Sequence, residues 1–412
     1  MRRLFLFAAY LFAFVSAPAN AMPPEPLIAK AVDASPMVMA AKADLDRAHA
    51  TAKRLRVGEY EVVVSGTGGR RTVDDPAFGE SEYTEWNAGL SRTVRLPAKR
   101  RADKDLASLE VEKTEAAYEN TRKDALLEFV ALWTDWRAAT EASLTARRLA
   151  NDAQQLAIAE EKAVKLGASR QIYVNQLSAE SALLLLEADR KVTEAENAMA
   201  NLAAAFPDLV IPASPVALEW DEARIIALME AEAPESAAVR EARLSRDQME
   251  TKARRARLDQ LADPTFGVQF ANEFGGNETS VMATVSIPLG GRARRAAAAE
   301  AGSQAVAASA RLRASELDAV RRYEQAKRAA KTASKNFNNA EDAVRQARSA
   351  MDRLKKGYTI GAVALGDLTA ARRTLTLTEQ ALVEYRITAE RAYLTLAVLN
   401  DGFAEPANHG QF

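Results

Sequence analysis

Apolar and polar residues alternate along four short segments of the sequence, which is the pattern of β-strands with two unlike faces. The apolar positions are Trp86, Ala88, Leu90, Val94 and Leu96 in the second segment, Phe266, Val268, Phe270 and Phe274 in the third, and Val281, Ala283, Val285 and Ile287 in the fourth. The first segment, residues 60–67, alternates less clearly, and Arg92 interrupts the apolar face of the second. Glycine-containing loops join the segments in pairs, so the sequence predicts two β-hairpins, at about 59–96 and about 264–289.

The rest of the sequence has the spacing and the composition of long α-helices. The run from Lys99 to Leu166 contains neither Pro nor Gly, and as an α-helix it would be about 100 Å long. A second run of similar length begins at Arg292. We therefore predict two long helical hairpins, residues 98–205 and 292–400. A mainly α fold with a small β part follows.

The same signals occur twice, about 195 residues apart, which indicates an internal repeat. The turn Lys165-Leu166-Gly167-Ala168 recurs as Thr359-Ile360-Gly361-Ala362. We predict a first repeat at 22–205, a Pro-rich linker at 206–219, a second repeat at 220–402 and a C-terminal tail at 403–412. Each repeat consists of a helix, a β-hairpin and a long helical hairpin. The first helix of each repeat is expected from Leu27 to about Val57 and from about Trp220 to Leu261.

The first 21 residues have the pattern of a secretory signal peptide. Arg2 and Arg3 precede an apolar run from Leu4 to Val15, and small residues stand one and three positions before a cut after Ala21. The apolar run is shorter than the roughly 20 residues that a membrane-spanning helix needs. We therefore expect the mature chain to work outside the cytoplasm.

No later apolar stretch is long enough for a spanning helix, so insertion into a membrane would require a closed β-barrel. Strands with one apolar face suit such a barrel, but about 8 strands is the smallest usual number. Four strands cannot close alone. The hairpins therefore belong either to a soluble sheet or to a barrel to which several copies of the chain contribute.

The sequence offers little reactive chemistry. It has no cysteine, a formal net charge of −1, and only two histidines, His49 and His409, which are far apart. Most carboxylates have basic residues three or four positions away, as in solvated helical salt bridges. We expect no enzyme activity, no catalytic residue, no metal site, no cofactor and no nucleic-acid partner.

The arrangement of elements resembles the TolC family of outer-membrane efflux proteins from residue 27 to about 402. The most specific part is Gly357-Tyr358-Thr359-Ile360-Gly361, followed by Gly366-Asp367-Leu368, which resembles the family motif at the periplasmic tip. The step Leu289-Gly290-Gly291-Arg292 resembles outer components of heavy-metal and related resistance-nodulation-division pumps.

The resemblance implies a homotrimer in which four strands per chain form a 12-stranded transmembrane β-barrel above a long α-helical coiled-coil barrel. Such a channel-tunnel is the exit duct of a tripartite efflux or type I secretion system in a Gram-negative bacterium. Its barrel lies in outer-membrane lipid and its helices in the periplasm. Its partners are a periplasmic adaptor, or membrane fusion protein, whose docking opens the duct, and an inner-membrane pump.

The resemblance also assigns residues. The adaptor-docking turns are Leu166, Gly167, Ala168, Ile360, Gly361 and Ala362, and the periplasmic aperture is assigned to Asp367 and Tyr358. Tyr358 is expected to form a hydrogen bond that holds the closed state. Asp367 belongs either to an acidic ring at the aperture or to the first turn of a helix, and the two assignments are compatible.

A second function class stays open at this point. A periplasmic coiled-coil adaptor or scaffold would account for the helices. It would not account for the alternating strands.

Overall fold

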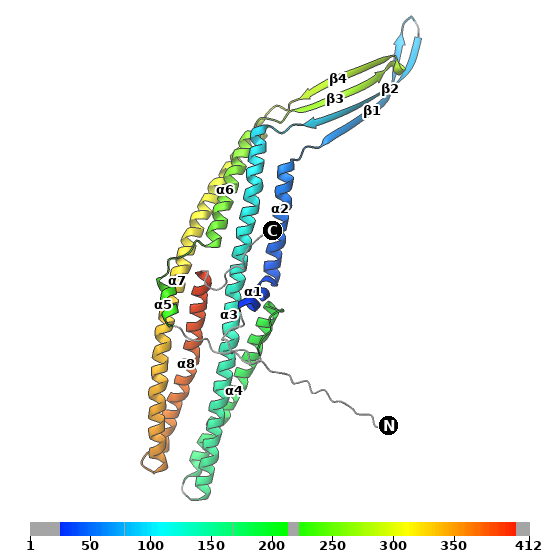
Figure 1. Cartoon of the computed structure of the whole chain (residues 1–412). Helices are drawn as coiled ribbons and strands as arrows, with labels where there is room; N and C mark the ends of the chain where they lie inside the picture. Colours follow the sequence, from blue (N-terminus) through cyan, green and yellow to red (C-terminus); the bar gives the residue numbers. More distant parts are fainter. Residues whose placement is uncertain (1–24, 78, 168, 213–221, 401–412) are drawn as a thin grey trace, which may run out of the picture. The chain divides into compact units, whose positions relative to one another are not determined.

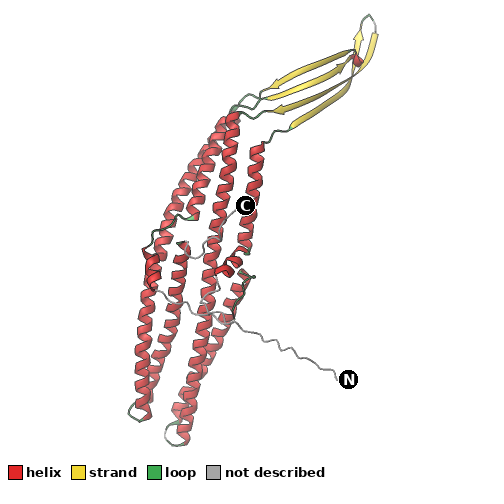
Figure 2. Ribbon diagram, viewed as in Figure 1, coloured by secondary structure: helices red, strands yellow, loops and turns green. Residues whose placement is uncertain are grey.

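A computed structural model describes residues 25–77, 79–167, 169–212 and 222–400. The expected signal peptide, the C-terminal tail and residues 213–219 of the Pro-rich linker lie outside the described residues. The chain is mainly α-helical with one small antiparallel sheet, as predicted (Figure 2). Its residues form two compact units: unit 1 contains residues 1–35, 125–232 and 325–412, and unit 2 contains residues 36–124 and 233–324.

Unit 2 contains the sheet (Figure 1). Its strands are β1 (Val62–Asp75), β2 (Gly79–Thr93), β3 (Thr265–Glu273) and β4 (Glu278–Ser286), all antiparallel and in the order β1-β2-β3-β4. The short 3-10 helix η1 (Phe274–Gly276) joins β3 to β4. Helices α2 (Pro36–Val57) and α6 (Ala237–Leu258) belong to the same unit, with the first parts of α3 (Pro97–Lys165) and α7 (Arg292–Thr359).

The register of the strands gives the sheet one apolar and one polar face. Leu90 pairs with Val64 on one side and Val268 on the other, and Phe270 pairs with Val281. Arg92, the exception in the alternation, lies on this apolar face between Val62 and Phe266. The predicted two-faced strands therefore combine into one two-faced sheet.

The exposure of these faces is the reverse of that in an ordinary soluble sheet. Along β2 and β3 the polar positions are the more covered ones and the apolar positions are exposed. Trp86 is 47% exposed, Leu90 56% and Val281 72%. Soluble proteins rarely leave so many neighbouring apolar side chains uncovered, and such a surface marks contact with another apolar phase or molecule.

Two glycines indicate that the sheet bends toward its polar face. A Cβ atom added to Gly267 would lie 3.2 Å from the Cβ of Ser91, and one added to Gly89 would lie 3.7 Å from the Cβ of Gln269. Opposed Cβ atoms in a sheet are normally about 4.5–5.5 Å apart. Gly66 and Gly68, on the apolar face, meet only backbone oxygens, at 3.7 and 3.9 Å. The polar face is therefore the concave one at Gly89 and Gly267.

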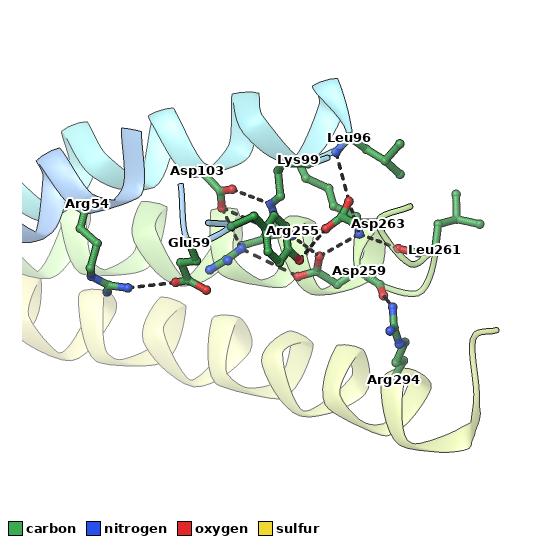
Figure 3. A network of polar contacts seen from close by, with 12 residues as sticks. Arg54, Glu59, Leu96, Lys99, Asp103, Arg255, Asp259, Leu261, Asp263 and Arg294 are labelled. Carbon is green, nitrogen blue, oxygen red and sulfur yellow. Dashed lines mark hydrogen bonds and ion pairs between the residues drawn. The ribbon is translucent and has the colours of Figure 1, made fainter. Parts of the chain in front are cut away.

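A network of charged side chains holds the connections between helices and strands in unit 2 (Figure 3). At its centre is the Asp263 carboxylate, which accepts hydrogen bonds from the Leu96 backbone N–H (3.0 Å), Arg95 (2.9 Å) and Tyr60 (2.9 Å). It also pairs with Lys99, whose Nζ is 3.1 Å away. Burial alone would raise the pKa of Asp263, but these four donors lower it to about 2.

The same network reaches the remaining connections. Arg95 also pairs with Asp103 on α3, and Arg294 on α7 donates to the carbonyl of Asp259, 2.8 Å away. The Lys99 side chain is 2% exposed, and its Nζ donates to the Leu261 carbonyl as well. Charges buried this deeply are tolerated only when they are paired and hydrogen-bonded. The network fixes the strand ends to the helices.

Unit 1 contains α1 (Glu25–Asp33), α4 (Gln171–Ala205), α5 (Glu222–Glu230) and α8 (Leu365–Leu399), with the last parts of α3 and α7. Its core includes aromatic residues of α3: Phe129 stacks on Trp133, and Trp133 packs edge-on against Trp136. Arg137 and Glu390 form an ion pair that joins α3 to α8, each side chain being 1% exposed. None of the described helices is both long and apolar enough to span a membrane.

Element lengths repeat along the chain. The helices have 9, 22, 69 and 35 residues in α1 to α4 and 9, 22, 68 and 35 in α5 to α8. The compact units do not follow the two predicted repeats, because each repeat contributes residues to both units.

One expected helix is divided in two in each half. The sequence predicted one helix from Leu27 to about Val57 and another from about Trp220 to Leu261. In the structure a break separates α1 from α2 at Ala34 and Ser35, and residues 231–236 separate α5 from α6. A proline follows or lies within each break, and proline disfavours helical backbone in the residue before it.

Candidate functional site

The two predicted docking turns have the same backbone geometry. Gly167 follows α3 with φ +72°, and Gly361 follows α7 with φ +76°. The Gly167 N–H donates to the Val164 carbonyl at 2.9 Å, and the Gly361 N–H donates to the Tyr358 carbonyl at 3.0 Å. Both glycines thus end a helix in the left-handed conformation that is typical of helix C-termini.

Backbone conformation accounts for both glycines within the chain. A Cβ atom at Gly167 or Gly361 would meet no atom of the described residues within 4 Å. Positive φ is therefore what the chain itself requires of both residues. The close contact lies at Gly357, where a Cβ atom would be 2.5 Å from Cγ2 of Val363.

Each turn presents a large apolar side chain to solvent. Leu166 is 84% exposed and Ile360 is 80% exposed. Ala362 is also exposed, and its N–H donates to the Gly357 carbonyl at 2.9 Å, whereas Ala168 lies outside the described residues. Both turns are in unit 1, where one apolar cluster contains Ala157 of α3, Leu177 of α4 and Leu368 of α8, with Tyr358 packed against it.

Tyr358 forms a hydrogen bond between the two helical hairpins. Its hydroxyl donates to Oε2 of Glu160 at 3.0 Å, and Glu160 also accepts a hydrogen bond from the hydroxyl of Ser169. Glu160 is buried, at 3% exposure. Burial, the bond to Glu160 and its negative charge raise the pKa of Tyr358 to about 12, so the hydroxyl remains a donor at any physiological pH.

Ion pairs also join the hairpins. Glu379 on α8 pairs with Arg148 on α3 (2.6 Å) and with Arg348 on α7 (2.8 Å). Burial would raise the pKa of Glu379, but hydrogen bonds from both arginines lower it below its usual value. Arg372 on α8 lies 3.6 Å from Glu180 on α4, and among the described residues neither terminal nitrogen of Arg372 has a hydrogen-bond partner. The Arg372–Glu180 pair is a loose one.

Asp367 is exposed and occupies the first turn of α8. The N-cap residue is Ala364, which has no side chain that could cap the helix, and the Asp367 N–H donates to its carbonyl at 3.2 Å. A carboxylate in a first turn interacts favourably with the helix dipole. This position agrees with the helix-start assignment and leaves the carboxylate accessible.

Sequence reasoning identified Tyr358 and missed its partner. Glu160, Glu379 and Arg372 were not singled out, because each is one charged residue among many along a helix. One signal was available: Glu160 lies on α3 close to the first glycine turn, as Tyr358 lies close to the second. Within the described residues, no group of three or more His, Cys, Asp or Glu side chains could hold a metal ion.

An amphipathic antiparallel sheet joined to long helical hairpins with glycine turns is the architecture of outer-membrane channels, and comparison with solved structures agrees. No protein-family model matches the sequence, and no curated protein matches it. The outer membrane protein VceC of Vibrio cholerae matches with a TM-score of 0.76 at 18% identity, over 92% of this chain and 96% of that one.

Two other channels match similarly. The CmeC outer membrane channel of Campylobacter jejuni has a TM-score of 0.76 at 14% identity, with 92% of this chain and 86% of that one covered. The open state of the Neisseria gonorrhoeae MtrE outer membrane channel has a TM-score of 0.70 at 18% identity, with 92% and 89% covered. The chain has the fold of the TolC family of outer-membrane channels, as the resemblance in the sequence predicted.

Proposed function

We propose that this protein is an outer-membrane channel-tunnel, the passive exit duct of a tripartite efflux or type I secretion system in a Gram-negative bacterium. The observation that carries the proposal is the reversed exposure of the sheet. Its apolar face is uncovered and its polar face is the concave one at Gly89 and Gly267. A sheet of this kind fits lipid on the outside and water on the inside.

Closure of the barrel requires more than one copy. The sheet ends in β1 and β4, whose outer edges would leave backbone N–H and C=O groups unpaired in lipid. Three copies, each pairing its β1 with the β4 of the next, give 12 strands and no free edge. The homotrimer of the TolC family supplies this number.

The helices form the periplasmic part of the duct. The turns at Gly167 and Gly361, with exposed Leu166 and Ile360, are the surface on which a periplasmic adaptor docks. Docking separates the α3–α4 hairpin from the α7–α8 hairpin and breaks the Tyr358–Glu160 bond, which opens the aperture. Asp367, repeated three times, forms an acidic ring there. An inner-membrane pump delivers the cargo, and the step at Leu289-Gly290-Gly291-Arg292 favours a pump of the resistance-nodulation-division type.

The alternative is a periplasmic coiled-coil adaptor or scaffold. It explains the helices but gives no reason for the exposed apolar face of the sheet, which in water would cause aggregation. The fold, that of outer-membrane channels, also favours the duct.

Membrane fractionation and gel mobility test the proposal. We expect the protein in the outer-membrane fraction as a trimer that resists dodecyl sulfate until it is heated. A soluble periplasmic protein, or a stable monomer inserted in the bilayer, would refute the duct.

A further inference from the structure

The turn between β3 and β4 holds an aromatic residue in an unfavourable backbone conformation. Phe274 has φ +50°, the one positive value among the described residues that are not glycine. Gly275 and Gly276 follow with φ +65° and +102°. For a bulky residue such a value is an outlier, so the conformation persists because surrounding contacts hold it.

The turn places the Phe274 ring on the opposite face of the sheet from the one predicted. Alternation assigned Phe274 to the apolar face together with Phe270, and this assignment is wrong, since β3 ends at Glu273. The Phe274 ring packs edge-on against Tyr83, with centroids 5.3 Å apart, and lies 4.9 Å from the guanidinium carbon of Arg71. Arg71 and Tyr83 pair in the register and lie on the polar face.

Charged groups fix the ring in this position. Arg71 Nε is 3.0 Å from Oε1 of Glu85, and the same Oε1 accepts the backbone N–H of Phe274 at 3.3 Å. A cation over an aromatic face adds electrostatic attraction. Phe274, Arg71 and Glu85 are therefore one connected cluster, built from three segments at the end of the four-stranded region farthest from the helix connections.

From this cluster, and resting on the proposed function, we propose that Phe274, Arg71 and Glu85 form an inward-facing collar that narrows the outer opening of the duct and in which Arg71 and Glu85 shift its ion selectivity in opposite directions. The polar face lines the water-filled interior, so each copy contributes one ring, one cation and one anion at the same level. Aromatic rings constrict the opening. Arg71 offsets the charge of Glu85 at this level, while Glu273 and Glu278, which pair in the register on the same face, leave the region acidic. Rings of charged side chains select ions by sign.

Single-channel recording in planar bilayers tests the collar with three variants. Phe274→Asn removes the ring while a residue that tolerates positive φ keeps the turn, so conductance should rise. Arg71→Gln leaves Glu85 unbalanced and should shift the reversal potential toward cation selectivity. Glu85→Gln leaves Arg71 unbalanced and should shift it toward anions. A purely structural cluster would not produce shifts of opposite sign.

Phe270→Ala is the matched control, because Phe270 is an aromatic residue of the adjoining strand β3 that packs against Trp86 on the apolar face, at a centroid distance of 5.5 Å. Its conductance should equal that of the parent. The collar is refuted if all three collar variants assemble as trimers and conduct and select like the parent. Loss of trimers in both charge variants would also refute it, since the cluster would then serve assembly. If the parent itself forms no channel, the proposed function fails instead.

Discussion

Buried charges occur in two regions of the molecule, and they differ in how many partners hold each group. At the strand connections of unit 2, Asp263 has four donors. Near the turns of unit 1, Glu160 accepts two hydrogen bonds, and Arg372 reaches Glu180 only at 3.6 Å. A group with many partners stays in place when one of them moves, whereas a group with one or two can be released. The buried charge at the strand connections therefore has more partners than the buried charges near the turns, and this difference fits the proposed separation of the hairpins.

The strongest test of this contrast is Asp263→Asn. The change removes the buried counter-charge of Lys99 and leaves it only the more exposed Asp259, and breaking a buried ion pair costs about 3–5 kcal/mol. Thermal unfolding, followed by circular dichroism in detergent, should move to a clearly lower temperature. Asp259→Asn is the control, because the Asp259 side chain is 37% exposed and its loss should cost much less. An equal effect of both variants would contradict the assignment of Asp263 as the centre.

The stability that the Asp263 carboxylate contributes should depend on pH. The folded pKa of Asp263, about 2, lies below the ordinary value for Asp of about 4. The stabilisation is therefore complete above about pH 4 and is lost as the pH falls toward 2. In Asp263→Asn this part of the pH dependence of unfolding should disappear.

A second test concerns the curvature of the sheet. Gly267→Val places a branched side chain against Ser91 on the concave face, and overpacking of this kind costs about 1–3 kcal/mol. We expect fewer trimers that resist dodecyl sulfate. Gly68→Val, on the apolar face where the nearest atom to a Cβ is a backbone oxygen at 3.9 Å, should assemble normally. Equal assembly of the two variants would remove the argument that the polar face is concave.

Loss of the hydrogen bond between Tyr358 and Glu160 should change channel opening and leave folding unchanged. Tyr358→Phe removes a hydrogen bond to a carboxylate, worth about 1.5 kcal/mol, while the ring keeps its packing. Trimers should form normally, but channels in planar bilayers should be open for a larger fraction of the time. Tyr173→Phe is the matched control, because Tyr173 packs against the same apolar cluster. An unchanged open fraction in Tyr358→Phe would show that this hydrogen bond does not control channel opening.

The next test asks whether the turns at Gly167 and Gly361 take part in adaptor docking. Gly361→Leu and Gly167→Leu force a side chain into left-handed backbone, at a cost of about 1–2 kcal/mol confined to the turn. Efflux should fall while outer-membrane levels stay intact. Gly302→Leu, in the first part of α7 with open space around its Cβ position, should leave efflux unchanged. Normal efflux in both turn variants would exclude these turns from docking.

The smallest structural effect is expected for Asp367→Asn. The residue is exposed, so only its interaction with the helix dipole is lost, about 0.5 kcal/mol. If Asp367 forms a ring, cation selectivity should decrease and block by a trivalent cation applied from the periplasmic side should be relieved. A variant that selects and is blocked like the parent would leave Asp367 as a helix-start residue only.

Local pattern was sufficient to predict the kinds of element and their approximate extent. Alternation marked the four strands, the run without Pro or Gly marked α3, and the glycines at 167 and 361 marked the turns. The glycines at 68, 69 and 79 misled: they predicted a loop over residues 68–79, but β1 continues to Asp75 and β2 begins at Gly79. Alternation failed as a guide at the end of β3, where a turn interrupts the strand. It assigned Phe274 to the apolar face by parity, although the two glycines that follow allow the chain to reverse there.

The sequence by itself therefore determined that the strands have two unlike faces and that the helices are long and end at paired glycine turns, because these properties arise from neighbours a few residues apart. Only the tertiary structure decided which face is concave, which acid binds Tyr358 and how Asp263 is held. Glu160 and Tyr358 are 198 residues apart, and Arg95 and Asp263 are 168 apart. Contacts over such separations depend on the register of strands and the packing of helices, which periodicity along the chain does not specify.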